Sequence, residues 1–398
     1  MQPFNPKKFT DKQVAQTKKL IGKERALIAV SGGVDSTTSA VLTFKAVGSN
    51  LLCVMLDDAF MREGEPKHIA DIVSQPPVKL PLEILDVKER FLKAMEGLKD
   101  AEEKRKAFRE TFYKVLGETA RKEGCKVLVQ GTIKADIDET TGGVKTQHNV
   151  LKQMGIDPVE QYGFKVVEPL ASLYKSQVRT LAHHFKIPTD IAERQPFPGP
   201  GLSVRVVGEI KRDKLDTVKK ATIISEKNFA KHIPSQYFAA ILDNQTTSHS
   251  RIRYIEENLA RLLNVPSRYV SIKAFEAKAT GIKEGKRKYG GIAALKVETM
   301  NGAHYQPPIS NLIALQAEVT RDPSFTRMLY TIQETPQRQP YVISLRAINT
   351  QDFLTAEVAE IPWTTLNETA GEILKACSNV SAIYYDVTPK PPATIEME

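Results

Sequence analysis

Short apolar runs, separated by charged stretches in which apolar residues recur at helical spacing, characterise the first half of the chain. Five of these runs have the length and composition of strands buried in a parallel sheet. They lie at 25–30, 50–56, 82–87, 126–130 and 165–168. Helical patterns accompany them at 11–22, 35–46 and 88–123. This alternation predicts an α/β fold, a doubly wound parallel sheet.

The loops after the first, second and fourth of these strands carry most of the candidate chemistry. They are 31–36, 57–62 and 131–149. Ligands of open α/β sheets bind outside the carboxyl ends of the strands. We therefore expect these loops to form one site.

The character of the chain changes at 196–201, where three prolines and two glycines occur in six residues. Such a segment cannot form regular structure, so it predicts a boundary between domains 1–195 and 196–398. The second domain gives weaker signals. Helices are expected at 211–230, 251–263 and 364–376, and strands at 341–347 and 381–387. The second domain is therefore expected to be α+β.

Composition narrows the class of protein. The length of 398 residues and the hydrophobic content of 41% suit two domains, and the net charge of +9 favours anionic partners such as nucleotides. The cysteines, Cys53, Cys125 and Cys377, are too far apart for a zinc motif or a disulfide framework. No apolar run of about 18 residues predicts a membrane span, and no signal peptide is recognisable. We expect a cytoplasmic protein.

The strongest motif is the loop after the first strand. It reads Ser31, Gly32, Gly33, Val34, Asp35, Ser36. Adjacent glycines allow a tight turn with exposed N–H groups, and the helix that follows directs its positive end at the loop. The loop is not a Walker A motif, because the Gly-Lys-Ser/Thr ending is absent. A carboxylate at Asp35 suits a phosphate socket if it holds Mg²⁺; the alternative is an ordinary turn.

This loop resembles the signature of the PP-loop ATP pyrophosphatases. The resemblance implies adenylation of a substrate oxygen with release of pyrophosphate, followed by displacement of AMP by a nitrogen or sulfur nucleophile. GMP, asparagine, argininosuccinate and NAD synthetases share the loop, as do tRNA thiolases. The loop alone does not choose among them.

Further segments resemble the synthetase part of the GMP synthetases. They are 57–62, 131–139 with 145–149, 194–205, and the C-terminal strings 344–347, 352–356 and 390–396. This resemblance implies amination of xanthosine monophosphate (XMP) to GMP through an adenyl-XMP intermediate, with ATP and Mg²⁺ as cofactors. It also implies that the second domain is a dimerisation and XMP-binding domain.

The resemblance assigns residues to three groups. ATP is assigned to Val30, Ser31, Gly32, Gly33, Val34, Asp35, Ser36, Asp57 and Gly131, with Mg²⁺ on Asp35. Catalysis is assigned to Asp35, Asp136, Glu139, Lys145 and His148, of which the last four lie on or beside a lid. XMP is assigned to Gly199, Gly201, Arg205, Lys390, Thr394, Ile395 and Glu396. Lys390 would contact its phosphate and Glu396 its base, while Gly199, Gly201 and Arg205 suit a phosphate by their donors alone.

Simpler interpretations of these groups remain. The lid segment can be a solvated charged loop, His148 a structural histidine, and 196–201 a rigid linker. The region 220–340 is longer than the usual dimerisation domain of the family, so we expect an insertion there of unassigned role.

Partners follow from the same resemblance. No glutaminase motif precedes the phosphate loop, so a separate glutamine amidotransferase subunit is expected to supply ammonia. A homodimer is expected. The basic residues are dispersed and no stacking motif is recognisable, so nucleic acid is not an expected partner.

Two alternatives stay open. One keeps the ATP chemistry with another nucleotide-like acceptor or an RNA to be thiolated, although no cysteine lies near a motif. The other is a nucleotide-binding regulatory protein without turnover. Asp58 and Ala59 stand where the family has Asn-Gly, and Gln147 stands where it has His.

Overall fold

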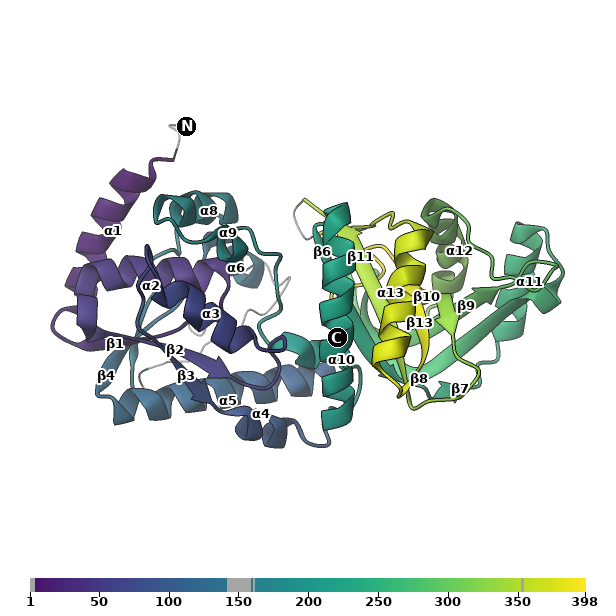
Figure 1. Cartoon of the computed structure of the whole chain (residues 1–398), viewed down its shortest axis with the longest axis horizontal. Helices are drawn as coiled ribbons and strands as arrows, with labels where there is room; N and C mark the ends of the chain where they lie inside the picture. Colours follow the sequence, from purple (N-terminus) through teal and green to yellow (C-terminus); the bar gives the residue numbers. More distant parts are fainter. Residues whose placement is uncertain (1–3, 142–158, 160–161, 352–353) are drawn as a thin grey trace. The chain divides into compact units, whose positions relative to one another are not determined.

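The computed structural model describes residues 4–141, 159, 162–351 and 354–398 (Figure 1). The chain forms two compact units. The first comprises Met1–Ala94 and Lys106–Gly199, and the second comprises Met95–Arg105 and Pro200–Glu398. Of the helices in the described part, none is long and apolar enough to cross a membrane.

The first unit contains a five-stranded sheet in the order β3-β2-β1-β4-β5. Its strands are β1 (Arg25–Ala29), β2 (Leu51–Asp57), β3 (Leu82–Asp86), β4 (Cys125–Val129) and β5 (Lys165–Val167). Every pair is parallel, which confirms the predicted sheet. The strand order reverses at β1 and β4, so the loops that follow these two strands diverge there and leave room for a ligand.

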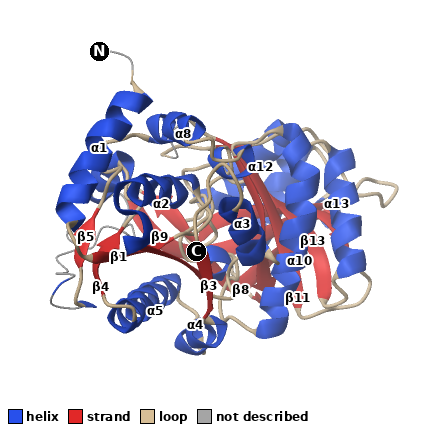
Figure 2. Ribbon diagram, turned by 60° about the vertical axis from the view of Figure 1, so that its left-hand side comes forward, coloured by secondary structure: helices blue, strands red, loops and turns tan. Residues whose placement is uncertain are grey.

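Helices cover both faces of this sheet. Those with bounds in this unit are α1 (Pro6–Ile21), α2 (Val34–Val47), α3 (Glu65–Ser74), α6 (Lys134–Thr141), α8 (Lys175–His184) and α9 (Thr189–Ala192). Figure 2 shows α1, α2 and α8 on one face, with α5 (Ala101–Lys122) on the other. Buried side chains such as Ile28, Leu42 and Leu181 form one core between sheet and helices.

The charged segment 88–123 is not the single helix that its pattern predicts. It forms α4 (Lys88–Met95) and α5, separated by a short break. Gly97 adopts φ 75° in this break, and Asp100 Oδ1 accepts hydrogen bonds from the N–H groups of Glu102 and Glu103 at the start of α5. A left-handed glycine ends a helix and an aspartate caps the next one. The break places Met95–Arg105 in the second unit.

The second unit is built on a mixed eight-stranded sheet. The order is β12-β11-β13-β10-β9-β8-β7, and β6 pairs with β11. The strands are β6 (Gln236–Asp243), β7 (Thr246–Thr247), β8 (Val270–Lys283), β9 (Lys286–Val297), β10 (Phe325–Glu334), β11 (Tyr341–Asn349), β12 (Glu357–Val358) and β13 (Val380–Asp386). The predicted strands at 341–347 and 381–387 are β11 and β13. The long strands β8, β9 and β10 were not predicted.

The main helices of this unit are α10 (Arg212–Phe229), α11 (Ile252–Leu263), α12 (Ile309–Arg321) and α13 (Trp363–Ala376). Three of them, α10, α11 and α13, correspond to the predicted helices. The sheet and helices fill most of 220–340, so this region is an integral part of the unit.

Candidate active site

The phosphate loop connects β1 directly to α2. Val30 N–H donates to Val54 O at 2.8 Å, which extends the sheet by one residue before the chain turns. Gly32 turns with φ 76°, and a Cβ on it would lie 2.9 Å from Ile69 Cγ1. Any side chain at position 32 would therefore be strained and would collide with α3.

The two serines of the loop bind each other. Ser36 Oγ accepts from Ser31 N–H at 3.1 Å and lies 3.0 Å from Ser31 Oγ. Gly33 is the N-cap of α2 and provides no side-chain cap. The first turn of α2 therefore keeps backbone N–H groups at the loop, where the helix dipole favours an anion. This geometry fits the predicted phosphate socket.

Gly131, after β4, lies against the start of α2. A Cβ on Gly131 would lie 2.8 Å from Ser36 N and 3.0 Å from the Asp35 carbonyl carbon. Both neighbours are backbone atoms, so only glycine fits here. The structure thus brings two of the predicted loops together, as the parallel sheet requires.

Asp35 lies at the centre of a charged cluster. Its Oδ2 accepts from Lys175 Nζ at 2.6 Å, and its Oδ1 is buried with no hydrogen-bond partner among the described residues. Burial raises the pKa of Asp35, Lys175 opposes that shift, and the charge of Asp136 adds to it. Asp136 Oδ2 accepts from Ile133 N–H at 3.0 Å. Two predicted acids therefore meet beside the phosphate loop.

Three cations near this loop were not predicted from the sequence. Lys175 and Arg179 lie four residues apart on α8, and both act on the pKa of Asp35. Arg194 forms an ion pair with Glu65, and its Nη1 would lie 3.4 Å from a Cβ on Gly32. The spacing of Lys175 and Arg179 was a usable signal, because residues four apart share one helix face.

The donor set fits Mg²⁺. Magnesium is commonly held by one or two carboxylates together with substrate phosphates, and the cluster offers Asp35, with its buried Oδ1, and the neighbouring Asp136. In the part of the chain with described side chains, no group of three or more His, Cys, Asp or Glu could hold a metal. The site therefore suits an ion that the nucleotide helps to bind.

The loop after β2 has unusual backbone and charge. Asp57 Oδ2 lies 3.1 Å from Lys88 Nζ. Burial raises the pKa of Asp58 to about 7, and its Oδ1 accepts from Phe60 N–H at 2.8 Å. Ala59 adopts φ 75°, a conformation that favours glycine. The two departures from the family's Asn-Gly thus fall where a neutral side chain and a glycine would fit better.

The predicted lid is only partly described. Glu139 belongs to α6, whereas Lys145 and His148 lie outside the described residues.

The predicted XMP residues lie at the end of the chain and in the segment that follows the proline-rich elbow. Gly199 is exposed, and Gly201 is buried at the start of a short 3₁₀ helix, Gly201–Val204. Lys390 pairs with Ala356 through its backbone, at 2.8 and 3.0 Å. Thr394, Ile395 and Glu396 are half-buried.

Arg205 has a different contact from the predicted one. Its Nε and Nη2 donate to the two carboxylate oxygens of Glu396 at 2.9 and 3.0 Å, and the side chain is 1% exposed. A guanidinium that is buried and committed to a carboxylate does not face a phosphate. The prediction that Arg205 binds phosphate therefore lacks support, because Nε and Nη2 already serve another predicted residue.

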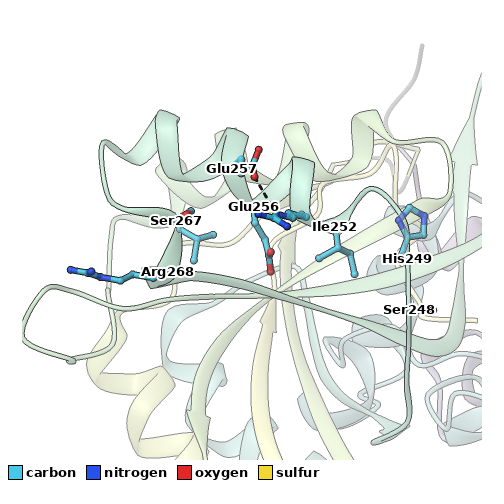
Figure 3. Close-up of a pocket in the computed structure, with 9 residues that line it drawn as sticks. Ser248, His249, Ile252, Glu256, Glu257, Ser267 and Arg268 are labelled. Carbon is cyan, nitrogen blue, oxygen red and sulfur yellow. Dashed lines mark ion pairs between the residues drawn. The ribbon is translucent and has the colours of Figure 1, made fainter.

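A surface hollow of about 630 Å³ lies between α11 and the start of β8 (Figure 3). None of the predicted site residues lines it. Arg253 pairs with Glu257 at 3.4 Å, and Glu256 accepts from Ile272 N–H at 2.7 Å. These charged groups already have partners, so the hollow is separate from the candidate chemistry.

Comparisons with known proteins agree with the architecture. A PP-loop domain family matches residues 6–189, and the family described as GMP synthase C terminal domain matches 331–397. The B-type subunit of GMP synthase (glutamine-hydrolyzing) from Sulfurisphaera tokodaii is 43% identical over 395 residues, covering 99% of this chain and 100% of that protein. The same subunit from Saccharolobus solfataricus is 41% identical with the same coverage. NMN synthetase from Francisella tularensis is 19% identical, with TM-score 0.40, over 50% of this chain and 79% of that chain.

The parallel sheet and the loop after β1 define a PP-loop protein that uses ATP. Within that class, the chain belongs to the family of these B-type GMP synthase subunits. Since the alignment to the Sulfurisphaera protein spans 99% of this chain, the region 220–340 is shared with that relative. The expected insertion is therefore not peculiar to this chain.

Proposed function

We propose that this protein is a carbon–nitrogen ligase that aminates XMP to GMP at the expense of ATP. The observation that carries the proposal is the cluster at the start of α2. Exposed N–H groups, the buried carboxylate of Asp35 and the ammonium of Lys175 lie together there. This arrangement suits a polyphosphate with its counter-ion, and the C-terminal family match fits a purine nucleotide as second substrate.

The proposed reaction has two steps. The C2 oxygen of XMP attacks the α-phosphorus of ATP, a P–O bond forms, and the bond to pyrophosphate breaks. Ammonia then attacks C2, the C2–O bond breaks, and AMP leaves with that oxygen while the nitrogen loses a proton. The loop N–H groups would hold the departing pyrophosphate, and Lys175 would offset its charge.

Asp35 and Asp136 would hold Mg²⁺, which when bound neutralises phosphate charge. We assign ATP to the loop 31–36 with Val30, Asp57 and Gly131. Glu139, Lys145 and His148 are assigned to the lid. Asp35 keeps its place in both the catalytic and the ATP-binding groups.

We assign XMP to the C-terminal segment and the elbow. Lys390 would contact the phosphate, Thr394 and Ile395 would flank the nucleotide, and Glu396 would face the base. Gly199 and Gly201 would supply backbone donors.

We propose a separate glutaminase subunit as the ammonia source, since the relatives are named as subunits of a glutamine-hydrolyzing enzyme. A homodimer is also proposed. Free, buried cysteines at 53, 125 and 377 fit a reducing compartment, and we place the protein in the cytoplasm.

The test is a reconstitution with the isolated chain. ATP, Mg²⁺, XMP and ammonium are mixed with it, and pyrophosphate and GMP are measured. We expect both products in equal amounts with ammonium, and with glutamine only after a glutaminase subunit is added. Pyrophosphate without GMP would indicate another acceptor. Neither product would indicate a regulatory nucleotide binder.

A further inference from the structure

The carboxylate of Glu396 is almost fully occupied by protein donors. Arg205 donates to both oxygens, and Gln236 Nε2 donates to Oε1 at 2.9 Å. A carboxylate offers about four acceptor positions. These contacts use both positions of Oε1 and one of Oε2. The Glu396 side chain is 17% exposed, so the described residues leave one acceptor position on Oε2 for a ligand.

Arg205 is itself held firmly. Its guanidinium carbon lies 4.1 Å from the ring centre of Phe238 on β6. Its N–H donates to Leu202 O, and its carbonyl accepts from Ile241 N–H, both at 2.9 Å. Stacking and backbone pairing together fix the direction in which the guanidinium points.

Two buried lysines fix the backbone around Arg205. Lys104 donates to the carbonyls of Ser203, Val206 and Gly208 at 2.7–3.2 Å, and it forms an ion pair with Glu398. Lys214 donates to Val207 O at 2.7 Å. Both lysine side chains are 0% exposed. Burying ammonium groups is costly unless they are fully paired, so their use here indicates that the 203–208 backbone is strictly positioned.

The segment that carries Glu396 is fixed from its other side. Arg327 Nη2 donates to Thr394 O and Oγ1 at 2.8 and 3.1 Å, and to Glu396 O. Arg346 donates to Ile395 O at 2.9 Å and Thr394 O at 3.1 Å. Both arginines share Asp386, at 2.5 and 2.8 Å. Backbone and side chain of Glu396 are thus fixed independently.

We propose that Arg205 is a positioning residue that orients Glu396 so that its one remaining acceptor receives a ring N–H of an oxopurine nucleotide. The proposal rests on the proposed function. Arg205 lies outside both matched family segments, 6–189 and 331–397. It therefore adds a specificity role that neither match describes.

The chemistry of the contact selects among purines. Xanthine, like hypoxanthine and guanine, presents a ring N–H that can donate to the remaining position of Oε2. Adenine presents a ring lone pair there and would repel the carboxylate. A site that leaves a buried acceptor unpaired rejects the wrong ligand strongly. The arrangement would keep ATP and AMP out of the XMP site.

Arg205→Met and Arg205→Lys test the proposal in the full chain. Calorimetry gives the Kd of XMP and AMP, and steady-state rates give the KM of XMP and ATP. We expect Arg205→Met to weaken XMP at least 30-fold and to reduce its preference over AMP, with the KM of ATP within twofold. Arg205→Lys should recover part of the XMP affinity. Lys231→Ala, at an exposed pair with Glu368, is the control and should change nothing.

Gln236→Leu protects the test if Arg205→Met does not fold. It opens a second acceptor on Glu396 and should lower the XMP-to-AMP preference less than Arg205→Met does. Equal losses for XMP and ATP, or unchanged XMP affinity in folded variants, would overturn the proposal. A wild type that binds neither XMP nor forms GMP would instead overturn the proposed function.

Discussion

The phosphate loop of the first unit and the C-terminal segment of the second are built by opposite means. The loop uses backbone N–H groups, two tightly placed glycines and a helix end, all supplied by residues close in sequence. The C-terminal segment is held by buried side-chain charges from positions as distant as Arg205, Arg327 and Glu398. Backbone donors need no side chain to be placed, whereas the charges need a whole folded unit.

The difference predicts different sensitivities. A backbone socket should tolerate many side-chain changes and fail only where a glycine or the central carboxylate is altered. A network of buried charges should fail when any member is removed, because its former partner stays buried without compensation. Four substitutions test this contrast.

Asp35→Asn should have the largest effect. It keeps the size of the side chain but removes the charge proposed to hold Mg²⁺, and we expect turnover to fall about 10⁴-fold, or roughly 5 kcal/mol. Pyrophosphate release is measured over a range of Mg²⁺ concentrations. Asp138→Asn, at a half-exposed acid paired with Lys134, is the control and should stay within threefold. Unchanged turnover in Asp35→Asn would end the proposed metal role.

Asp386→Asn should come next, and in the other region. Burial alone would raise the pKa of Asp386, but the charges of Arg346 and Arg327 hold it below its usual value. Removing this carboxylate leaves two buried guanidiniums facing each other. We expect a loss of about 4 kcal/mol of stability, measured by denaturation together with hydrogen exchange of 388–396. Glu368→Gln, at the surface, should cost under about 0.5 kcal/mol. A loss below about 1 kcal/mol for Asp386→Asn would contradict the network.

Asp58→Asn should stabilise the first unit. Because the folded-state pKa of about 7 lies above the ordinary value of 3.8, the carboxyl stabilises the fold only while protonated. Its contribution is complete below pH 3.8 and is lost as the pH rises through about 7. Asparagine stays neutral and keeps an acceptor for Phe60 N–H, so we expect a gain of about 2 kcal/mol at pH 8.

The measurement is the unfolding free energy at several pH values from 4 to 8. The gain should vanish toward pH 4, and Asp71→Asn, on an exposed face of α3, should show no such dependence. A gain that is constant with pH would mean that Asp58 ionisation is not its cause.

Ala59→Gly should have the smallest effect. Glycine relieves the strain of φ 75°, but it loses a buried methyl and gains chain entropy in the unfolded state. We expect a net gain of about 0.5 kcal/mol in thermal denaturation. Ala46→Gly, in the ordered helix α2, should instead lose about 1 kcal/mol. Similar losses at both positions would show that the loop after β2 is unstrained.

The first unit was predictable because its signals are local. Each strand of the parallel sheet is a short apolar run, and the Gly-Gly loop marks the end of β1 by itself. Lys175 and Arg179 were missed because a cation on a helix is usually a solvated residue. Only its meeting with Asp35 shows that Lys175 belongs to the site.

The second unit was harder to predict for physical reasons. In β8 the residues 270–275 alternate apolar and polar, but a register shift between Phe275 and Lys278 breaks the period. A bulge moves later side chains to the other face, so a period-two pattern no longer continues. In β10 the buried Thr326 and Arg327 hide a strand whose residues are otherwise apolar.

The sequence by itself determined the phosphate loop, the parallel sheet that presents it, and the elbow at 196–201, because each depends on neighbours along the chain. Only the tertiary structure decided that Arg205 holds Glu396 and that Lys104 and Arg327 secure the segments around them. Those contacts join residues up to 294 positions apart, from Lys104 to Glu398. The charge of a side chain is written in the sequence, but its partner is chosen by burial, which leaves a charged group no alternative to the nearest opposite charge.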